Sequence, residues 1–244
     1  MPTMDNLSRW GVGALAMLLV SACGGYPMFQ TGKTTTPGKV SLDFGGAVMN
    51  NPKHDHPREE GVGVVGDVGM RVGAIPNLDF GFGTYMGAGL RGETKVNFLS
   101  PRSPAGLALR IGGGFGAPFS RDHEQIFMGM AGVVASYEVA DILSVYGGGT
   151  FFNHWIYRDR PTWAELQPGE WYAPRSGYGD GILQLGLGLK LRTGSNSALF
   201  AEYDRWIPAQ DDVGDFFQFD PANLVAFALQ VCLSDGCDLA MPQR

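Results

Sequence analysis

Apolar side chains recur at every second position over most of this 244-residue chain. The clearest stretch, residues 183–191, has leucine at each odd position and glutamine, glycine or lysine at each even position. Successive side chains of an extended strand point to opposite faces, so this period predicts strands with one apolar face and one polar or glycine-lined face. Helical spacing is nowhere sustained. The predicted fold class is therefore all-β.

Turn-rich segments divide the chain into ten candidate strands. They span residues 39–49, 61–74, 77–86, 88–98, 105–116, 125–138, 141–155, 178–192, 197–207 and 222–233. Short connections, such as 74–77 and 193–197, alternate with long ones, such as 156–177 and 208–221. The single Gly87 between two strands requires either a very tight turn or one long bent strand. Strands of about ten residues are long enough to cross a bilayer at a tilt.

Short turns at one end and long loops at the other resemble the bacterial outer-membrane β-barrels. The resemblance implies a closed antiparallel up-and-down barrel of about ten strands (8–10) over residues 39–233. Closure is required because lipid offers no hydrogen-bond partners for a free sheet edge. The tail at 234–244 departs from the many barrels of this class that end on an aromatic residue. The alternative is a soluble, lipid-anchored barrel with its apolar side chains inside, binding a small apolar ligand.

The first residues of the sequence are predicted to be an export signal. The apolar run at 11–20 is about half the length of a transmembrane helix and is typical of a cleaved signal peptide. The four residues Val20-Ser21-Ala22-Cys23 resemble the lipobox of bacterial lipoproteins. This resemblance implies that residues 1–22 are removed, that Cys23 carries the lipid, and that 23–38 form a lipidated tether leading to the outer membrane. The alternative is an ordinary signal peptide with a chance cysteine.

Charged side chains on the polar strand faces are predicted to line the lumen. They comprise six basic and five acidic groups: Asp67, Arg71, Asp79, Arg91, Glu93, Lys95, Arg110, Lys190, Arg192, Glu202 and Asp204. Such a near-balanced set can pair across the barrel, which offsets the cost of burying each charge. The candidate strands 125–138 and 141–155 carry apolar residues on both faces, so their orientation stays open.

Five aromatic residues on the strands are expected to contribute to girdles at the two membrane interfaces, where their amphipathic rings are favoured. They are Tyr137, Tyr146, Trp155, Tyr203 and Trp206.

Two cysteines remain once Cys23 is lipidated. Cys232 and Cys237 are close enough in sequence to close a small disulfide loop at the start of the predicted periplasmic tail. An oxidising periplasm would permit that bond. The alternative is two free thiols.

All four histidines fall at or near predicted extracellular positions: His54, His56, His123 and His154. Imidazoles beside carboxylates suit zinc or copper, but the same residues are typical of any solvated loop. Known barrel enzymes use Asp/His pairs or Ser/His/Glu sets. His154 is followed by Trp155-Ile156 with no nearby serine. No catalytic centre is expected, and no cofactor besides the lipid on Cys23.

A net charge of −6 without any lysine- or arginine-rich run excludes nucleic acid as an expected partner. Membrane lipid is the main expected partner. The aromatic loops 156–177 and 208–221 favour contact with envelope proteins or polysaccharide, or else form a lid over the barrel. The sequence predicts a lipid-anchored outer-membrane barrel with a structural or surface-binding role, either alone or within a larger assembly. The alternatives are a narrow solute channel and a barrel enzyme acting on envelope lipid or peptide.

Overall fold

The computed structural model describes residues 29–50, 62–85, 89–116, 124–158, 178–208 and 222–233. Ten β-strands account for most of them. The strands are β1 (Val40–Asn50), β2 (Val62–Ile75), β3 (Leu78–Tyr85), β4 (Gly89–Asn97), β5 (Ala105–Gly116), β6 (Glu124–Ala140), β7 (Leu143–Arg158), β8 (Tyr178–Arg192), β9 (Ser197–Pro208) and β10 (Ala222–Cys232). Within the described ranges, no helix is long and apolar enough to span a membrane.

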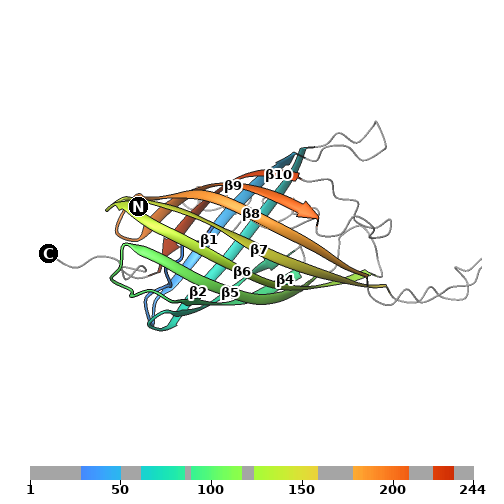
Figure 1. Cartoon of the computed structure of the whole chain (residues 1–244), viewed down its shortest axis with the longest axis horizontal. Coiled ribbons are helices and arrows are strands. Elements are labelled where there is room, and N and C mark those ends of the chain that lie inside the picture. The colour runs from blue at the N-terminus through green and yellow to red at the C-terminus, as the bar shows by residue number, and fades with distance from the viewer. Residues whose placement is uncertain are drawn as a thin grey trace, which may run out of the picture.

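The strands form one closed antiparallel barrel (Figure 1), in which each strand pairs with its neighbours in sequence. β1 closes the barrel against β10, with Ser41 opposite Cys232 and Asn50 opposite Asn223. The predicted closed up-and-down barrel of ten strands is thus confirmed, and every predicted strand end lies within three residues of the observed one. β3 and β4 are separate paired strands, with Tyr85 opposite Gly89.

Short turns gather at one end of the barrel, which we call the short-turn end. The connections there are residues 76–77, 98–104, 141–142 and 193–196. Asn77 adopts the left-handed conformation (φ 69°) that a tight turn requires. Because the strand number is even, β1 begins and β10 ends at this same end. The three longest connections, residues 51–61, 159–177 and 209–221, belong to the opposite end, which we call the long-loop end.

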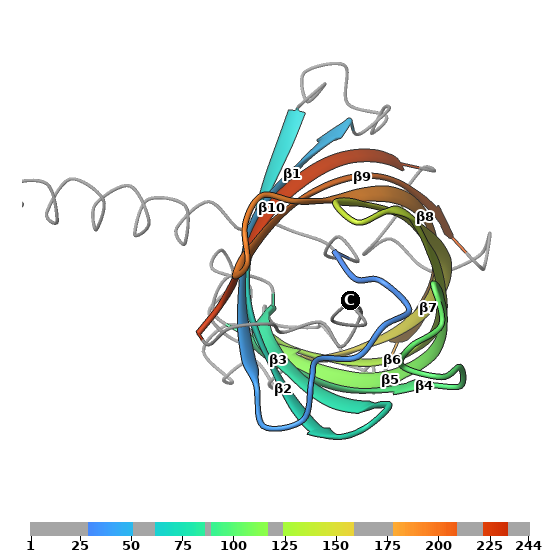
Figure 2. The ribbon, with the colours of Figure 1, turned by 90° about the vertical axis from the view of Figure 1, so that its left-hand side faces the viewer.

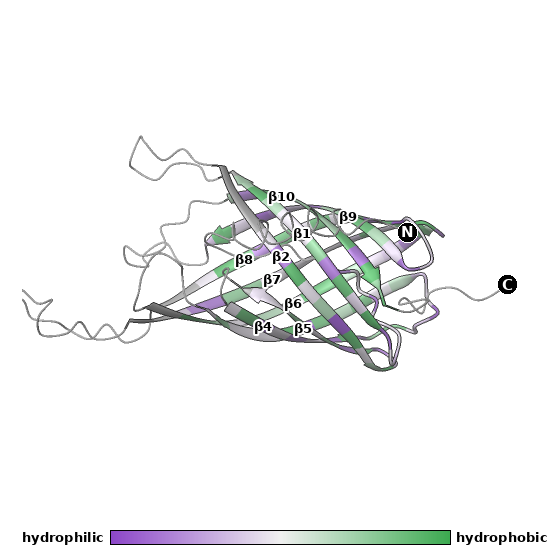
Figure 3. Ribbon diagram, turned by 180° about the vertical axis from the view of Figure 1, so that it is seen from behind, coloured by the Kyte–Doolittle hydropathy of each residue, from purple (hydrophilic) through white to green (hydrophobic). Residues whose placement is uncertain are grey.

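Hydrophobic and hydrophilic residues alternate along the strands (Figure 3), and many large hydrophobic side chains are exposed on the outside of the barrel. On β8, Leu185, Leu187 and Leu189 are 44%, 72% and 49% exposed, whereas the alternating Gln184 and Lys190 are buried inside. A soluble barrel has the opposite polarity, with its apolar side chains inside. The alternation of apolar and polar residues along the sequence therefore corresponds to an outward apolar face and an inward polar face of each strand.

The lumen has two unlike walls. Strands β2 to β5 carry most of the buried charges, whereas β6 to β10 carry an apolar cluster that includes Met128, Phe152 and Leu224. This second wall explains why β6 and β7 are apolar on both faces: one face meets lipid and the other packs inside the barrel.

The aromatic girdle expectation is wrong for two of its five residues. Tyr137, Trp155 and Tyr203 point outward and are about half exposed. Tyr146 and Trp206 point into the lumen, where they are 4% and 3% exposed. The strand register places both of them in phase with buried residues, so their rings pack in the interior.

Residues 29–37 precede β1 and lie inside the barrel, and we call them the N-terminal strap. Figure 2, which looks in from the short-turn end, shows the strap within the ring of strands. Residues 29–35 are all buried, and Pro37 forms an isolated bridge with Gly73. Residues 29–35 of the segment predicted to be a lipidated tether are therefore packed in the lumen.

Candidate functional site

The centre of the charged wall is Arg71 on β2. Its guanidinium lies 2.6 Å from Asp79 Oδ1 on β3 and also pairs with Glu93 on β4. Glu93 forms a second ion pair with Arg110 on β5. Glu93 Oε2 accepts hydrogen bonds from Arg110 Nη2 at 2.8 Å and from Arg110 Nε at 3.1 Å. One chain of alternating charges thus crosses four neighbouring strands, and each buried charge has an opposite charge beside it, as burial requires.

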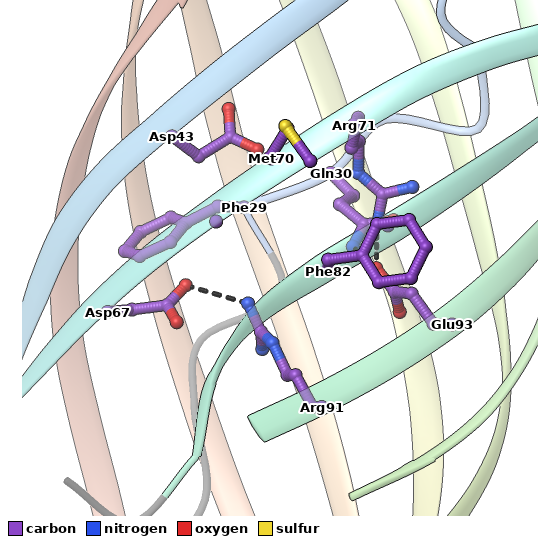
Figure 4. A pocket seen from close by; sticks show the side chains of 11 residues that line it. Phe29, Gln30, Asp43, Asp67, Met70, Arg71, Phe82, Arg91 and Glu93 are labelled. Carbon is purple, nitrogen blue, oxygen red and sulfur yellow. Dashed lines mark hydrogen bonds and ion pairs between the residues drawn. The ribbon is translucent and has the colours of Figure 1, made fainter. Parts of the chain in front are cut away.

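Two further ion pairs extend this wall. Lys95 lies 3.4 Å from Asp79. Arg91 lies 2.9 Å from Asp67 Oδ2 on β2, an interaction that Figure 4 shows near Arg71 and Glu93. On β1, Asp43 accepts a hydrogen bond of 2.9 Å from Gln230. The inward positions of five adjacent strands therefore form one polar wall, in which three sets of paired side chains meet around a common cavity.

The structure places the predicted lumen residues inside the barrel, with one partial exception. Those that are buried are Asp67, Arg71, Asp79, Glu93, Lys95, Arg110, Lys190, Glu202 and Asp204. The side chain of Arg91 is 9% exposed. Arg192 is half-buried at the short-turn end. Asp67, Asp79 and Glu93 form ion pairs with basic side chains of the charged wall. Glu202 and Asp204 lie on the other wall.

Sequence reasoning missed two charged residues of the lumen. Asp43 is in phase with the buried Ser41 on β1, so the alternation could have identified it. Lys33 lies on the strap, where no alternation exists. Its Nζ donates to the backbone carbonyls of Pro101 and Ser103 and lies 4.0 Å from Glu138. Lys33 thereby fastens the strap at the short-turn end.

The strap is held mainly by its own backbone. The N–H of Thr35 donates to Asp79 Oδ2 at 2.8 Å, and the N–H of Gly32 donates to Ser136 Oγ at 3.0 Å. Deeper in the lumen, the N–H of Phe29 donates to Glu202 Oε2 at 2.8 Å. These contacts come from β3, β6 and β9, so the strap is bound on several sides.

Side chains of the strap add to these contacts. Gln30 donates to Glu93. The ring of Phe29 lies edge-on to Phe200, with 6.4 Å between centroids. One residue of the strap thus bonds to the charged wall while its neighbour packs on the apolar wall.

Glycines of the barrel wall make room for the strap. A Cβ on Gly45 would lie 2.5 Å from the ring of Phe29, and one on Gly73 would lie 2.1 Å from the carbonyl oxygen of Thr36. A Cβ on Gly106 would lie 2.7 Å from the carbonyl carbon of Gly32. Because no side chain fits at these three positions, the wall and the strap form a matched pair.

A second polar cluster lies on the opposite wall. Tyr146 on β7 donates to Glu202 Oε2 at 2.8 Å, the same oxygen that the N–H of Phe29 contacts. Asp204, two residues further along β9, is fully buried. Lys190 lies over the ring of Phe200, 5.5 Å from its centroid. The strap therefore joins the two walls of the lumen.

A small cavity lies where the strap meets the charged wall (Figure 4). Its polar lining includes Gln30 from the strap, Asp43 and Asp67, and the guanidinium groups of Arg71 and Arg91. Asp67 Oδ1 and Gln30 Oε1 have no hydrogen-bond partner in the described part of the chain. The cavity is therefore a polar space that suits water.

The remaining predicted sites lie mostly outside the described residues. This holds for Cys23, Cys237, His54, His56 and His123, and for most of the loops 156–177 and 208–221. His154 is buried and stacks on Phe152, with 6.3 Å between ring centroids. No group of three or more potential metal ligands gathers among the residues described. Cys232 is disulfide-bonded, and its pairing with Cys237 stays a prediction.

The fold and the lumen define a class: a β-barrel with an apolar exterior, a charged interior and an N-terminal strap inside the barrel. No protein-family model matches the sequence, and no curated protein matches it. Solved outer-membrane proteins share its general architecture. OmpT of Vibrio cholerae is 12% identical with a TM-score of 0.37, over 76% of this chain and 63% of that one. This chain thus spans less than two thirds of that protein.

Two further structures cover most of their own length. The outer membrane protease OmpT of Escherichia coli is 8% identical with a TM-score of 0.41, over 82% of this chain and 96% of that one. Neisserial surface protein A is 12% identical with a TM-score of 0.34, over 79% and 95%. These similarities are too weak to carry a functional argument, so the proposal below rests on the barrel's own polarity and interior.

Proposed function

We propose that this protein is a lipid-anchored β-barrel of the bacterial outer membrane with a structural or surface-binding role. The observation that carries the proposal is the polarity of the barrel. A ring of exposed apolar side chains suits lipid, and the inward charges are paired with one another. The lipobox at Val20–Cys23 supports a second attachment, through acyl chains on Cys23.

The contents of the lumen favour this role over that of a resting channel. The strap and the ion pairs occupy the interior, and a ten-strand barrel is only slightly wider than one that side chains already fill. Contact with envelope proteins or polysaccharide is assigned to the loops 156–177 and 208–221, because aromatic residues favour such interfaces. No catalytic role is proposed.

The anchor is tested by comparing the wild type with Cys23→Ser in cells fed a labelled palmitate analogue. We expect label on the wild type only, and wild-type protein in the outer-membrane fraction on a density gradient. Cys23→Ser should still give a barrel that changes its gel mobility on boiling, since the strands themselves span the lipid. Equal labelling of both proteins would refute the anchor. Wild type that fractionates away from the outer membrane would refute the location.

The surface role is tested with an epitope inserted into the 159–177 loop. Antibody should reach the epitope on intact cells, whereas the same epitope placed in the 98–104 turn should be reached only after the cells are permeabilised. The opposite result would contradict the assigned orientation and the binding role of the loops.

A further inference from the structure

We propose that the N-terminal strap is the plug of a latent pore: once residues 29–37 leave the lumen, the barrel conducts small ions and prefers cations. This inference rests on the proposed membrane placement and adds an activity to it. It draws on four features of the lumen, namely the closed wall, the glycines behind the strap, the internal pairing of the charges and their balance.

The barrel wall is complete without the strap. All ten strands are joined by antiparallel ladders, and β1 pairs directly with β10. The strap residues Thr35 and Pro37 form isolated bridges, that of Pro37 with Gly73, and neither belongs to a ladder between two of the ten strands. Displacing the strap therefore breaks no strand pairing, and the closed cylinder is expected to persist.

Displacement would leave open space. Gly45, Gly73 and Gly106 line the path of the strap, and their lack of side chains is what admits it. No wall side chain at these positions can fill the volume once the strap is gone. A cavity with polar lining already lies beside Gln30 of the strap, so water is expected to enter and extend it.

The charged wall does not need the strap to remain paired. Arg71 with Asp79, Arg110 with Glu93, and Arg91 with Asp67 are contacts within the wall itself. The carboxylates of this wall would lose only the hydrogen bonds that they accept from the strap, such as that from Thr35 N–H to Asp79. On β6, the half-buried Glu138 would lose its contact with Lys33. Water can replace those donors. No carboxylate of the charged wall is therefore left buried without a partner when the strap is displaced.

The lumen charges set the ion preference. With the strap in place, the buried charged side chains of the described lumen together with Arg91 comprise six acidic groups and six basic ones, including Lys33. The half-buried Glu138 and Arg192, both at the short-turn end, balance each other. Lys33 leaves with the strap, so six acidic groups then face five basic ones. Because a lumen of slightly negative charge raises the local concentration of cations, the open barrel is expected to be weakly cation-selective.

Two variants displace the strap without changing the wall. A Cβ at Gly32 would lie 2.5 Å from the carbonyl carbon of Gly106, so Gly32→Val cannot fit. The second variant replaces residues 29–37 with a Gly/Ser linker of equal length, which removes the contacts of Phe29, Gln30 and Lys33. The matched control is Gly92→Val, where the nearest atom to a new Cβ is 3.9 Å away.

Each full-length protein is purified, checked for a mobility shift on boiling, and inserted into planar bilayers in KCl. We expect the wild type and Gly92→Val to stay at baseline. Both strap variants should show single-channel steps, with a reversal potential in a KCl gradient displaced towards that of K⁺. An anion-selective reversal potential would overturn the cation assignment.

Other outcomes overturn the plug itself. The plug would be refuted if both strap variants shift on boiling and insert into the bilayer but show no conductance. It would also be refuted if the wild type conducts as well as the strap variants. Loss of the heat shift in both strap variants, with the control intact, would show that the strap is needed for folding. Absence of a heat shift in the wild type would instead refute the membrane barrel on which the inference rests.

Discussion

Arg71 on β2 and Asp79 on β3 are joined inside the barrel by an ion pair of 2.6 Å between Nη1 and Oδ1. The other oxygen of Asp79 accepts the backbone N–H of Thr35 from the strap at 2.8 Å. A single carboxylate thus belongs to both the wall network and the strap contact. The wall network and the strap are therefore coupled. A substitution in one of them should change the stability of the other.

Arg71→Ala should destabilise the barrel by up to about 3–5 kcal/mol, the cost of breaking a buried ion pair. It removes one of two basic partners from each of two buried carboxylates, leaving Asp79 with Lys95 and Glu93 with Arg110. The measurement is the urea dependence of the fraction that keeps its unheated gel mobility in lipid vesicles. Arg102→Ala is the control, since Arg102 is exposed in the β4–β5 turn and its loss should cost less than about 0.5 kcal/mol. Equal effects of the two substitutions would contradict the role of the network.

Leu187→Arg tests the outer face. Leu187 is 72% exposed on β8, and an arginine facing the middle of a bilayer costs about 2–4 kcal/mol in such barrels. Folding into phosphatidylcholine vesicles should therefore be weakened by that amount, with Leu187→Phe close to wild type. A soluble barrel would tolerate the arginine, so an unchanged midpoint would count against the lipid-facing assignment.

Tyr146 and Glu202 should show energetic coupling. Tyr146 donates to the carboxylate of Glu202 at 2.8 Å in the lumen, and a hydrogen bond to a charged group contributes about 1.5–3 kcal/mol. The cycle compares Tyr146→Phe, Glu202→Gln and the double variant by unfolding in urea. Strictly additive effects would mean that this contact does not connect β7 to β9 energetically.

Gly106→Val should expel the strap from the wall side, because its Cβ would lie 2.7 Å from the carbonyl carbon of Gly32. The readout is maleimide labelling of Thr34→Cys, measured on the peptide that carries position 34. Thr34 is 4% exposed, so labelling should be slow in an otherwise wild-type chain. Adding Gly106→Val should make it fast, while adding Gly92→Val should not.

The barrel itself could be predicted from the sequence because each strand repeats the same two environments. The leucines of 183–191 face lipid at every odd position, and this local rule fixes strand and orientation together. It fails where both environments are apolar, as on β6 and β7. There Phe152 faces the lumen and Phe151 the lipid, and composition alone does not distinguish the two.

The lumen site could be predicted only in part. The charges of the wall follow the same alternation, but their pairing depends on the register between strands, which a single strand does not encode. The strap carries no period, and its glycine, threonine and proline residues are typical of an exposed linker. Its burial depends on Gly45, Gly73 and Gly106, which come together only once the barrel closes. Tyr146 and Trp206 show the same limit, since an amphipathic ring suits both an interface and a polar lumen.

The central claim is that this chain forms a closed barrel within the membrane. It is tested most directly by washing membranes with alkaline carbonate and then comparing unheated with boiled samples on a denaturing gel. The account predicts a carbonate-resistant protein whose band shifts on boiling, because the closed sheet resists detergent until it is heated. Protein that remains with the membrane through its lipid but shows no shift would contradict the membrane-spanning barrel.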